Sequence, residues 1–159
     1  MSVAAISKAL QARLRQVLID TPTAAGQPAL AETVYSAREY DAVAENNMLC
    51  PSVAVIYSGY TPIQRPGQAA NQANRQQVGF QFLVVLNVSS AYDTATAEGI
   101  QDEVSPLFDA VLKALLGFRP LQGFLPMTLD PAPGAAVSSA GFGYYPIAFT
   151  TAASYVGTP

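Results

Sequence analysis

The stretches PSVAVIYSGY (51–60) and VGFQFLVVLNVS (78–89) decide how this chain folds. In the second stretch apolar side chains recur at every other position, and those positions are Phe80, Phe82, Val84, Leu86 and Val88. Alternation with a period of two predicts a β-strand that turns one face towards a hydrophobic core. In the first stretch both alternating sets from Val53 to Ile56 are apolar, which favours a central strand.

The segment between these strands, from Gly59 to Gln77, is predicted to be a long loop. It is rich in glutamine and contains two prolines, and its only charged residues are Arg65 and Arg75. Two strands joined in this way indicate an extended hairpin whose tip projects beyond the body of the protein. Long loops on a rigid sheet commonly bind partners, although a tip without a role is the alternative. The candidate binding residues are Gln64, Arg65, Arg75, Gln76 and Gln77.

An amphipathic helix is predicted over residues 3–19. Its apolar stripe consists of Ile6, Leu10, Leu14, Val17 and Leu18. We expect this helix to end at Asp20-Thr21-Pro22, because the residue before a proline avoids the helical region.

A longer helix is predicted to begin at Asp93 or Thr94 and to run to about Leu116. Its stripe consists of Ile100, Val104, Leu107, Phe108, Val111, Leu112 and Leu115. Pro106 lies inside this helix, so the helix either kinks or restarts with Ser105 as its N-cap. Gly117 is expected to terminate it.

The remaining elements complete an α+β pattern. Residues 32–35 are expected to be extended, and Ser36-Ala37-Arg38-Glu39 has the form of a capping box that opens a short helix to about Glu45. Strands are expected at 123–129, on an edge because of Pro126, and at 141–155. We therefore expect one domain over residues 1–159, with a mostly antiparallel sheet and helices at 3–19 and 95–116 on one of its faces.

Composition excludes several classes of function. Only 12% of the 159 residues are charged, and the net charge is −3, so no basic surface is available for nucleic acid. The longest apolar run, Phe82–Leu86, is far too short to cross a membrane. A surface poor in charge suits contact with other proteins, although a host with small neutral surface residues would produce the same composition.

The chemical groups that catalysis needs are scarce. The chain has no histidine and a single cysteine, Cys50, which is expected to be a small buried hydrophobe. Asp102, Glu103 and Asp109 lie on a predicted helix without the spacing of a carboxylate pair. The Gly141-Phe142-Gly143 segment lacks the rest of a dinucleotide site. We expect no enzymatic activity, no cofactor and no metal.

Several motifs taken together resemble a known family. They are SAREYDAVAENN (36–47), CPSVAVIYSGY (50–60), VGFQFLVVLNV (78–88), ALLGFRP (114–120) and YYPIAFTT (144–151). Their order, over roughly residues 33–151, is similar to that of the tail-terminator, or tail-completion, proteins of long-tailed phages, particularly the Mu-like group. No single motif is specific to this family.

The resemblance implies a structural role in the virion tail. Proteins of this family form a ring, usually a hexamer, that caps the tail tube, stops its growth and meets the neck or connector of the head. The tube, the neck and possibly a sheath would then be partners, with assembly in the cytoplasm of the bacterial host. Gln64, Arg65, Arg75, Gln76 and Gln77 would contact a neighbouring subunit or the tube. The alternative is another head–tail connector or minor tail protein.

Overall fold

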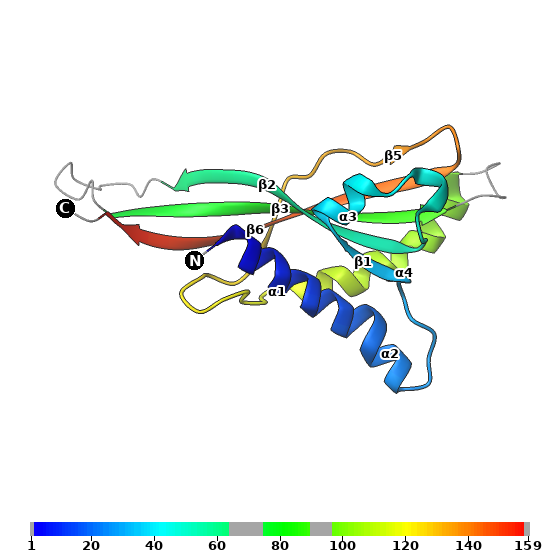
Figure 1. Cartoon of the computed structure of the whole chain (residues 1–159), viewed down its shortest axis with the longest axis horizontal. Helices are drawn as coiled ribbons and strands as arrows, with labels where there is room; N and C mark the ends of the chain where they lie inside the picture. Colours follow the sequence, from blue (N-terminus) through cyan, green and yellow to red (C-terminus); the bar gives the residue numbers. More distant parts are fainter. Residues whose placement is uncertain (1, 64–74, 90–96, 158–159) are drawn as a thin grey trace.

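The computed structural model describes residues 2–63, 75–89 and 97–157, and its central feature is a long twisted sheet (Figure 1). The strands are β1 (Thr33–Ser36), β2 (Ser52–Ile63), β3 (Arg75–Ser89), β4 (Thr128–Asp130), β5 (Ala136–Val137) and β6 (Phe142–Val156). The helices are α1 (Val3–Arg15), α2 (Thr21–Ala24), α3 (Ala37–Ala42) and α4 (Ala97–Leu115), with a π-helical turn at Gln16–Asp20 and a 3-10 turn at Glu45–Asn47.

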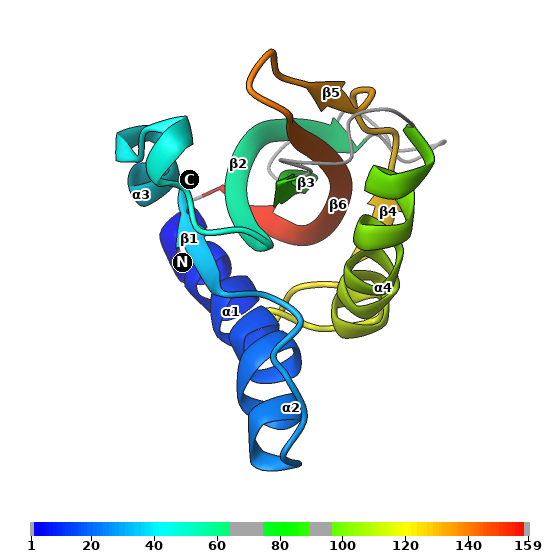
Figure 2. The same ribbon diagram turned by 90° about the vertical axis from the view of Figure 1, so that its right-hand side faces the viewer.

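The sheet confirms the predicted α+β class. Its strand order is β1-β2-β3-β6-β4, and β5 also pairs with β6. Only β1 and β2 are parallel, while the remaining neighbours are antiparallel. Figure 2 looks along the sheet and shows β2 and β6 curling around β3, which lies in the middle.

The hydrophobic core lies between one face of this sheet and the helices α1 and α4. All five alternating side chains of β3 from Phe80 to Val88 are buried there, as predicted. They belong to one cluster with Leu10 and Leu14 of α1 and with Val111 of α4. Phe108, which was expected in this stripe, is instead 37% exposed, because Leu107 and Val111 occupy the inward face of α4.

The first helix does not stop before Pro22, contrary to the prediction. The chain widens into the π-helical turn at Gln16–Asp20 and continues helically to Ala24, with Pro22 in the first turn of α2. Proline lacks an N–H, so it cannot donate to the carbonyl of Leu18 four residues earlier. The N–H of Leu30 donates to that carbonyl instead, at 2.8 Å.

The helix α4 is continuous through Pro106, so the restart at Ser105, one of the two alternatives expected from the sequence, is not observed. Pro106 and Asp102 are both exposed. Pro106 has no N–H to donate to the carbonyl of Asp102. This carbonyl lies on the solvent side of α4, where water can donate to it instead. The helix ends before Gly117, whose φ of 77° is left-handed, as expected for a terminating glycine.

The short helix α3 begins with the predicted capping box, in which Ser36 and Glu39 exchange side-chain and backbone hydrogen bonds. It packs near the opposite face of the sheet from α1 and α4. There the hydroxyl of Tyr40 donates to Asn87 of β3 at 2.9 Å, and Asn87 donates to Ser52 of β2 at 3.2 Å. Both Asn87 and Ser52 are fully buried, so this polar chain fixes α3 to the sheet.

The predicted strand at 123–129 is mostly irregular. Phe124 forms an isolated bridge with Ala153, and regular pairing begins only at Thr128, in β4. Pro126 explains the interruption, because it has no N–H for a ladder bond. The edge position expected for this segment is confirmed, since β4 pairs with β6 alone.

Candidate interaction surface

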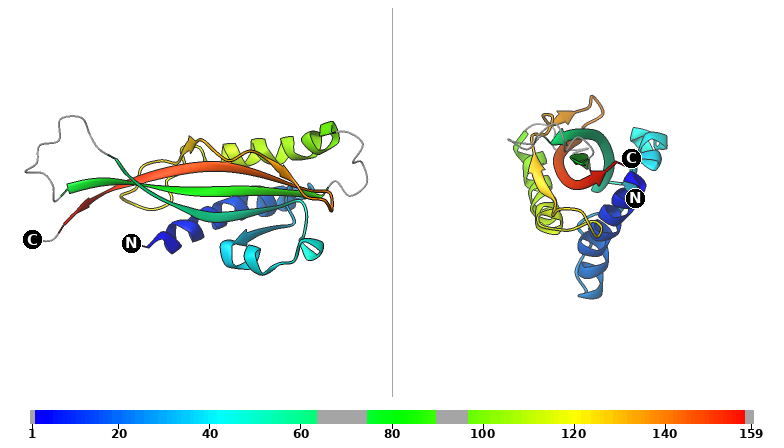
Figure 3. Two further views of the ribbon diagram at one scale, coloured as in Figure 1. Left: turned by 90° about the horizontal axis from the view of Figure 1, so that it is seen from above. Right: turned by 90° about the vertical axis from the view of Figure 1, so that its left-hand side faces the viewer.

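The strands β2, β3 and β6 continue beyond the helices as a three-stranded extension, which we define as residues 59–63, 75–79 and 152–156. Figures 1 and 3 show it projecting past the N-terminus of α1. The three strands stay in register to their ends, with Ile63 opposite Gln77 and Gln77 opposite Ser154. The predicted loop at 59–77 is thus too long, because β2 reaches Ile63 and β3 already begins at Arg75.

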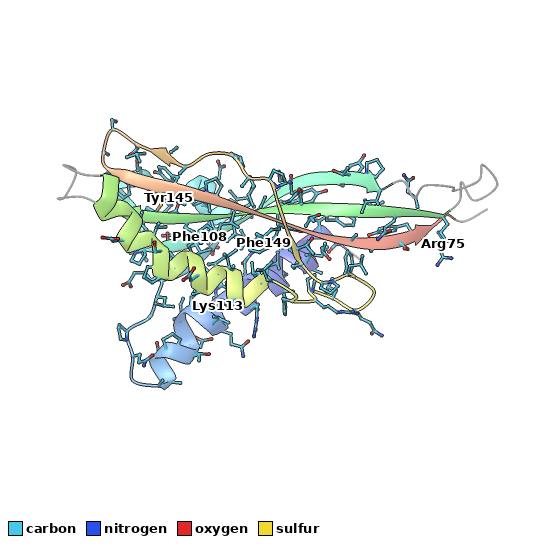
Figure 4. All side chains as sticks on the ribbon, turned by 180° about the vertical axis from the view of Figure 1, so that it is seen from behind. Arg75, Phe108, Lys113, Tyr145 and Phe149 are labelled. Carbon is cyan, nitrogen blue, oxygen red and sulfur yellow. The ribbon has the colours of Figure 1, made fainter. Side chains whose placement is uncertain are left out.

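Charge is almost absent from the extension. The strands β2, β3 and β6 together contain one charged residue, Arg75. Figure 4 shows Arg75 at the tip of the extension, far along the sheet from Lys113 of α4. A surface with so little charge is unusual for a part of a protein that stays exposed to solvent. The centres of protein interfaces are likewise depleted of charged residues.

Aromatic side chains gather on the face of the extension that continues the core. The ring of Phe80 lies 5.8 Å from that of Phe124 and 6.1 Å from that of Tyr155, between ring centroids. Tyr60, opposite Phe80 in the register, is 70% exposed, and Tyr155 is 41% exposed. The core therefore does not end in a polar rim here but opens into exposed aromatic rings, a feature typical of binding surfaces.

The predicted binding residues are divided between the two faces of the extension. Gln76 is opposite Tyr155 and shares the aromatic face, whereas Arg75 and Gln77 lie on the other face, opposite Val156 and Ser154. Arg75 and Gln76 are exposed, and Gln77 is half-buried. The other two predicted residues, 64 and 65, lie outside the described residues.

Sequence reasoning missed the apolar half of this surface. Tyr60, Ile63, Tyr155 and Val156 are all exposed at the ends of strands. They are far apart in the sequence, and only the pairing of β2, β3 and β6 brings them together. The sequence offered one signal, the lack of charged residues in β2 and β6. The low overall charge was noted, but it was not assigned to these strands.

Half-buried tyrosines link separate segments of the fold. The hydroxyl of Tyr144 donates to Glu45 at 2.8 Å, and burial, followed by this bond to a carboxylate, raises the pKa of Tyr144. Burial likewise raises the pKa of Tyr40. Both phenols therefore stay protonated and act as donors that attach the segment 37–47 to the sheet.

Two further classes of site were sought in the described part of the chain. Across residues 2–63, 75–89 and 97–157, no three His, Cys, Asp or Glu side chains are grouped so that they could hold a metal ion. Among the helices described, none has both the length and the apolar character needed to span a membrane.

An α+β protein with a nearly uncharged, partly aromatic strand extension has the features of a protein that associates with other proteins. The comparison with known families makes this specific, because the family described as phage tail terminator protein matches residues 8–156. The chain belongs to the phage tail terminator family, and it is a structural component of a phage tail. This family consists of structural virion proteins and not of enzymes.

The resemblance drawn from the sequence motifs is thus confirmed at the level of the family. The narrower likeness to the Mu-like group stays a prediction. No curated protein matches the chain.

Proposed function

We propose that the chain forms a homo-oligomeric ring, most simply a hexamer, on the end of the tail tube. The ring stops growth of the tube and joins the tail to the neck or connector of the head, and a sheath is a further partner in a contractile tail. Assembly takes place in the cytoplasm of the bacterial host. The observation that carries this proposal is the family match over residues 8–156, which covers nearly the whole chain.

The extension supports the proposal, because it offers a surface that association would bury. It is long and nearly uncharged, and it presents exposed aromatic rings away from the helices. In this proposal Arg75, Gln76 and Gln77, together with Gln64 and Arg65, contact a neighbouring subunit or the tube. Their donors can pair with carboxylates and backbone carbonyls, and each such bond contributes only about 0.5–1.5 kcal/mol, so several act together.

The test compares tails made with and without this chain. Electron microscopy of tails from a host that cannot produce the chain should show tubes of irregular length that do not join heads. Purified chain added to uncapped tubes should appear as a ring at one end, and native mass spectrometry should give its subunit number. The main alternative, another connector or minor tail protein, predicts tubes of normal, uniform length in the absence of the chain.

A further inference from the structure

The outer sides of β2 and β6 are each covered by other segments for part of their length and are left open in the extension. Along the outer side of β6, β4 and β5 add their own ladders, and the N–H of Leu125 donates to the carbonyl of Ala152 at 2.8 Å. On the opposite side, β1 pairs only with Ser52–Val55 of β2. Within the described residues, the outer edge of β2 is therefore unpaired from residue 56 to residue 63, and that of β6 from residue 154 to residue 156.

These two open edges belong to the same extension and lie at the same position along the strand direction. Ile63 is opposite Gln77, which is opposite Ser154, so the end of β2 and the free part of β6 flank β3 at one height. Neither edge carries a charged residue. Natural sheets usually blunt an exposed edge with charges, bulges or proline. Here the bulge between Tyr57 and Gly59 and the single proline at position 62 are the only such devices on β2.

We propose that the open edge of β2 (56–63) in one copy of this chain pairs with the free end of β6 (154–156) in the next copy. This inference rests on the proposed ring and names the contact that would build it. A second copy is the occupant that fits best, because each chain carries one edge of each kind. Pairing between copies would then cover both edges of every subunit, whereas another protein docked on one edge would leave the second exposed.

The direction of the contact follows from the topology. Both β2 and β6 are antiparallel to β3, so both run towards the tip of the extension. Copies related by rotation about an axis along the extension keep this direction, and the β2–β6 contact between them is therefore parallel. A contact between two different surfaces is head-to-tail, and it generates a closed ring when the rotation closes. Closure also removes both open edges of the extension from the resulting circle of strands.

The contact would also bury the exposed apolar side chains beside both edges. Tyr60 and Ile63 flank the edge of β2, and Tyr155 and Val156 flank that of β6, where Val156 is 64% exposed. Main-chain hydrogen bonds supply the pairing in such strand additions, and neighbouring side chains supply the specificity.

Paired cysteines provide the test, in a Cys50→Ser background. Ser154→Cys is combined in turn with Thr61→Cys and Ile63→Cys, which share its face of the sheet, and Tyr155→Cys is combined with Tyr60→Cys on the aromatic face. The three pairs sample several registers. Within one chain the two cysteines are separated by β3, about 9–10 Å across two strand spacings, beyond the ~7 Å that a disulfide spans between Cα atoms. After oxidation of assembled rings, at least one pair should give a ladder of covalent oligomers on a non-reducing gel.

The matched controls separate the proposed contact from random collision. Each cysteine alone should leave the chain monomeric on the gel, and Ser154→Cys combined with Asp41→Cys, which lies on α3, should give no ladder. Dimers from a single cysteine would overturn the proposal, because they indicate a symmetric contact. Rings that form while none of the three pairs cross-links would also overturn it, yet they would leave the proposed function standing. Absence of any ring, even on tube ends, would refute both.

A second substitution tests the same edge without cysteines. Thr61→Lys places a charge on the exposed edge of β2 and should weaken ring assembly at least tenfold, while the circular dichroism of the subunit stays unchanged. Thr128→Lys, on the exposed edge strand β4, is the matched control and should assemble normally. Equal assembly of the two variants would contradict the assignment of the edge.

Discussion

Phe82 shows at the scale of one residue what holds the sheet to the helices. Its side chain is fully buried in the centre of β3, opposite Phe149 of β6 and 5.5 Å from the ring of Tyr57. Phe82→Ala should lower the free energy of unfolding by about 3–5 kcal/mol, because it leaves a cavity in a closely packed core. Urea denaturation measures the loss. Leu83→Ala, on the other face and half-buried, should cost less, and a loss below about 1 kcal/mol for Phe82→Ala would contradict this position of the core.

Glu39 makes a second prediction at the scale of one residue, about pH. The N–H of Ser36 donates to its carboxylate at 2.7 Å, and this bond lowers the pKa of Glu39 from its usual value. A lowered pKa means that the contribution to stability is complete above the unfolded value and is lost as the pH falls through the folded value. Glu39→Gln keeps a capping side chain but cannot titrate.

The variant should therefore lose less stability than the natural chain between neutral pH and about pH 3, where carboxylates protonate. Denaturation at several pH values measures the difference. Asp41→Asn in the same helix removes one charge without touching the cap and serves as the control. Parallel pH profiles for the natural chain and Glu39→Gln would show that the cap does not contribute to acid sensitivity.

At the scale of an element, the helix α4 contains an interior proline, Pro106, which lowers the stability of the protein. An interior proline costs about 3 kcal/mol relative to alanine in a helix, and its stiffening of the unfolded chain returns about 1 kcal/mol at most. Pro106→Ala should therefore raise the free energy of unfolding by about 2 kcal/mol. Ser105→Ala, at the neighbouring exposed position, is the comparison. If Pro106→Ala leaves the free energy of unfolding nearly unchanged, the pyrrolidine ring of Pro106 causes no strain in α4.

The elements also show where sequence reasoning succeeds. Alternation in β3 and β6 was readable because one face of each strand is buried, and the capping box of α3 was readable because it is local. The ends of β2 and β3 were not readable. From Tyr60 to Ile63 and from Arg75 to Gln77 no face is fully buried, so the residues carry no period of two.

Two other predictions were wrong for different reasons. The helix passes Pro22 because Leu30, eight residues later, donates to the carbonyl that proline leaves free. Phe108 lies at the side of the core, because fewer positions of α4 face the sheet than are apolar in the sequence. At the candidate surface the sequence named polar residues whose contacts stay a prediction. It did not indicate the aromatic face, since Tyr60 and Tyr155 are brought together only by the pairing of three strands.

At the scale of the whole molecule, Arg75 is the one charge on a projecting surface that otherwise offers apolar and neutral groups. If this residue contacts a neighbouring subunit or the tube, as proposed, Arg75→Glu should remove a charge-assisted hydrogen bond that contributes about 1.5–3 kcal/mol to binding. The occupancy of tube ends should fall by roughly 10- to 100-fold, since each 1.4 kcal/mol corresponds to a factor of ten. Because Arg75 is exposed, the isolated subunit should keep its thermal stability.

The matched variant Arg119→Glu makes the same change of charge at an exposed position just beyond α4, outside the residues of the extension. It therefore controls for the effect of net charge on association, which acts over the whole surface and weakens with salt. Counting capped tubes by electron microscopy over a range of protein concentrations compares the two variants directly. If Arg75→Glu and Arg119→Glu cap tubes equally well, Arg75 does not contact a partner through its charge, and its place among the proposed contact residues is wrong.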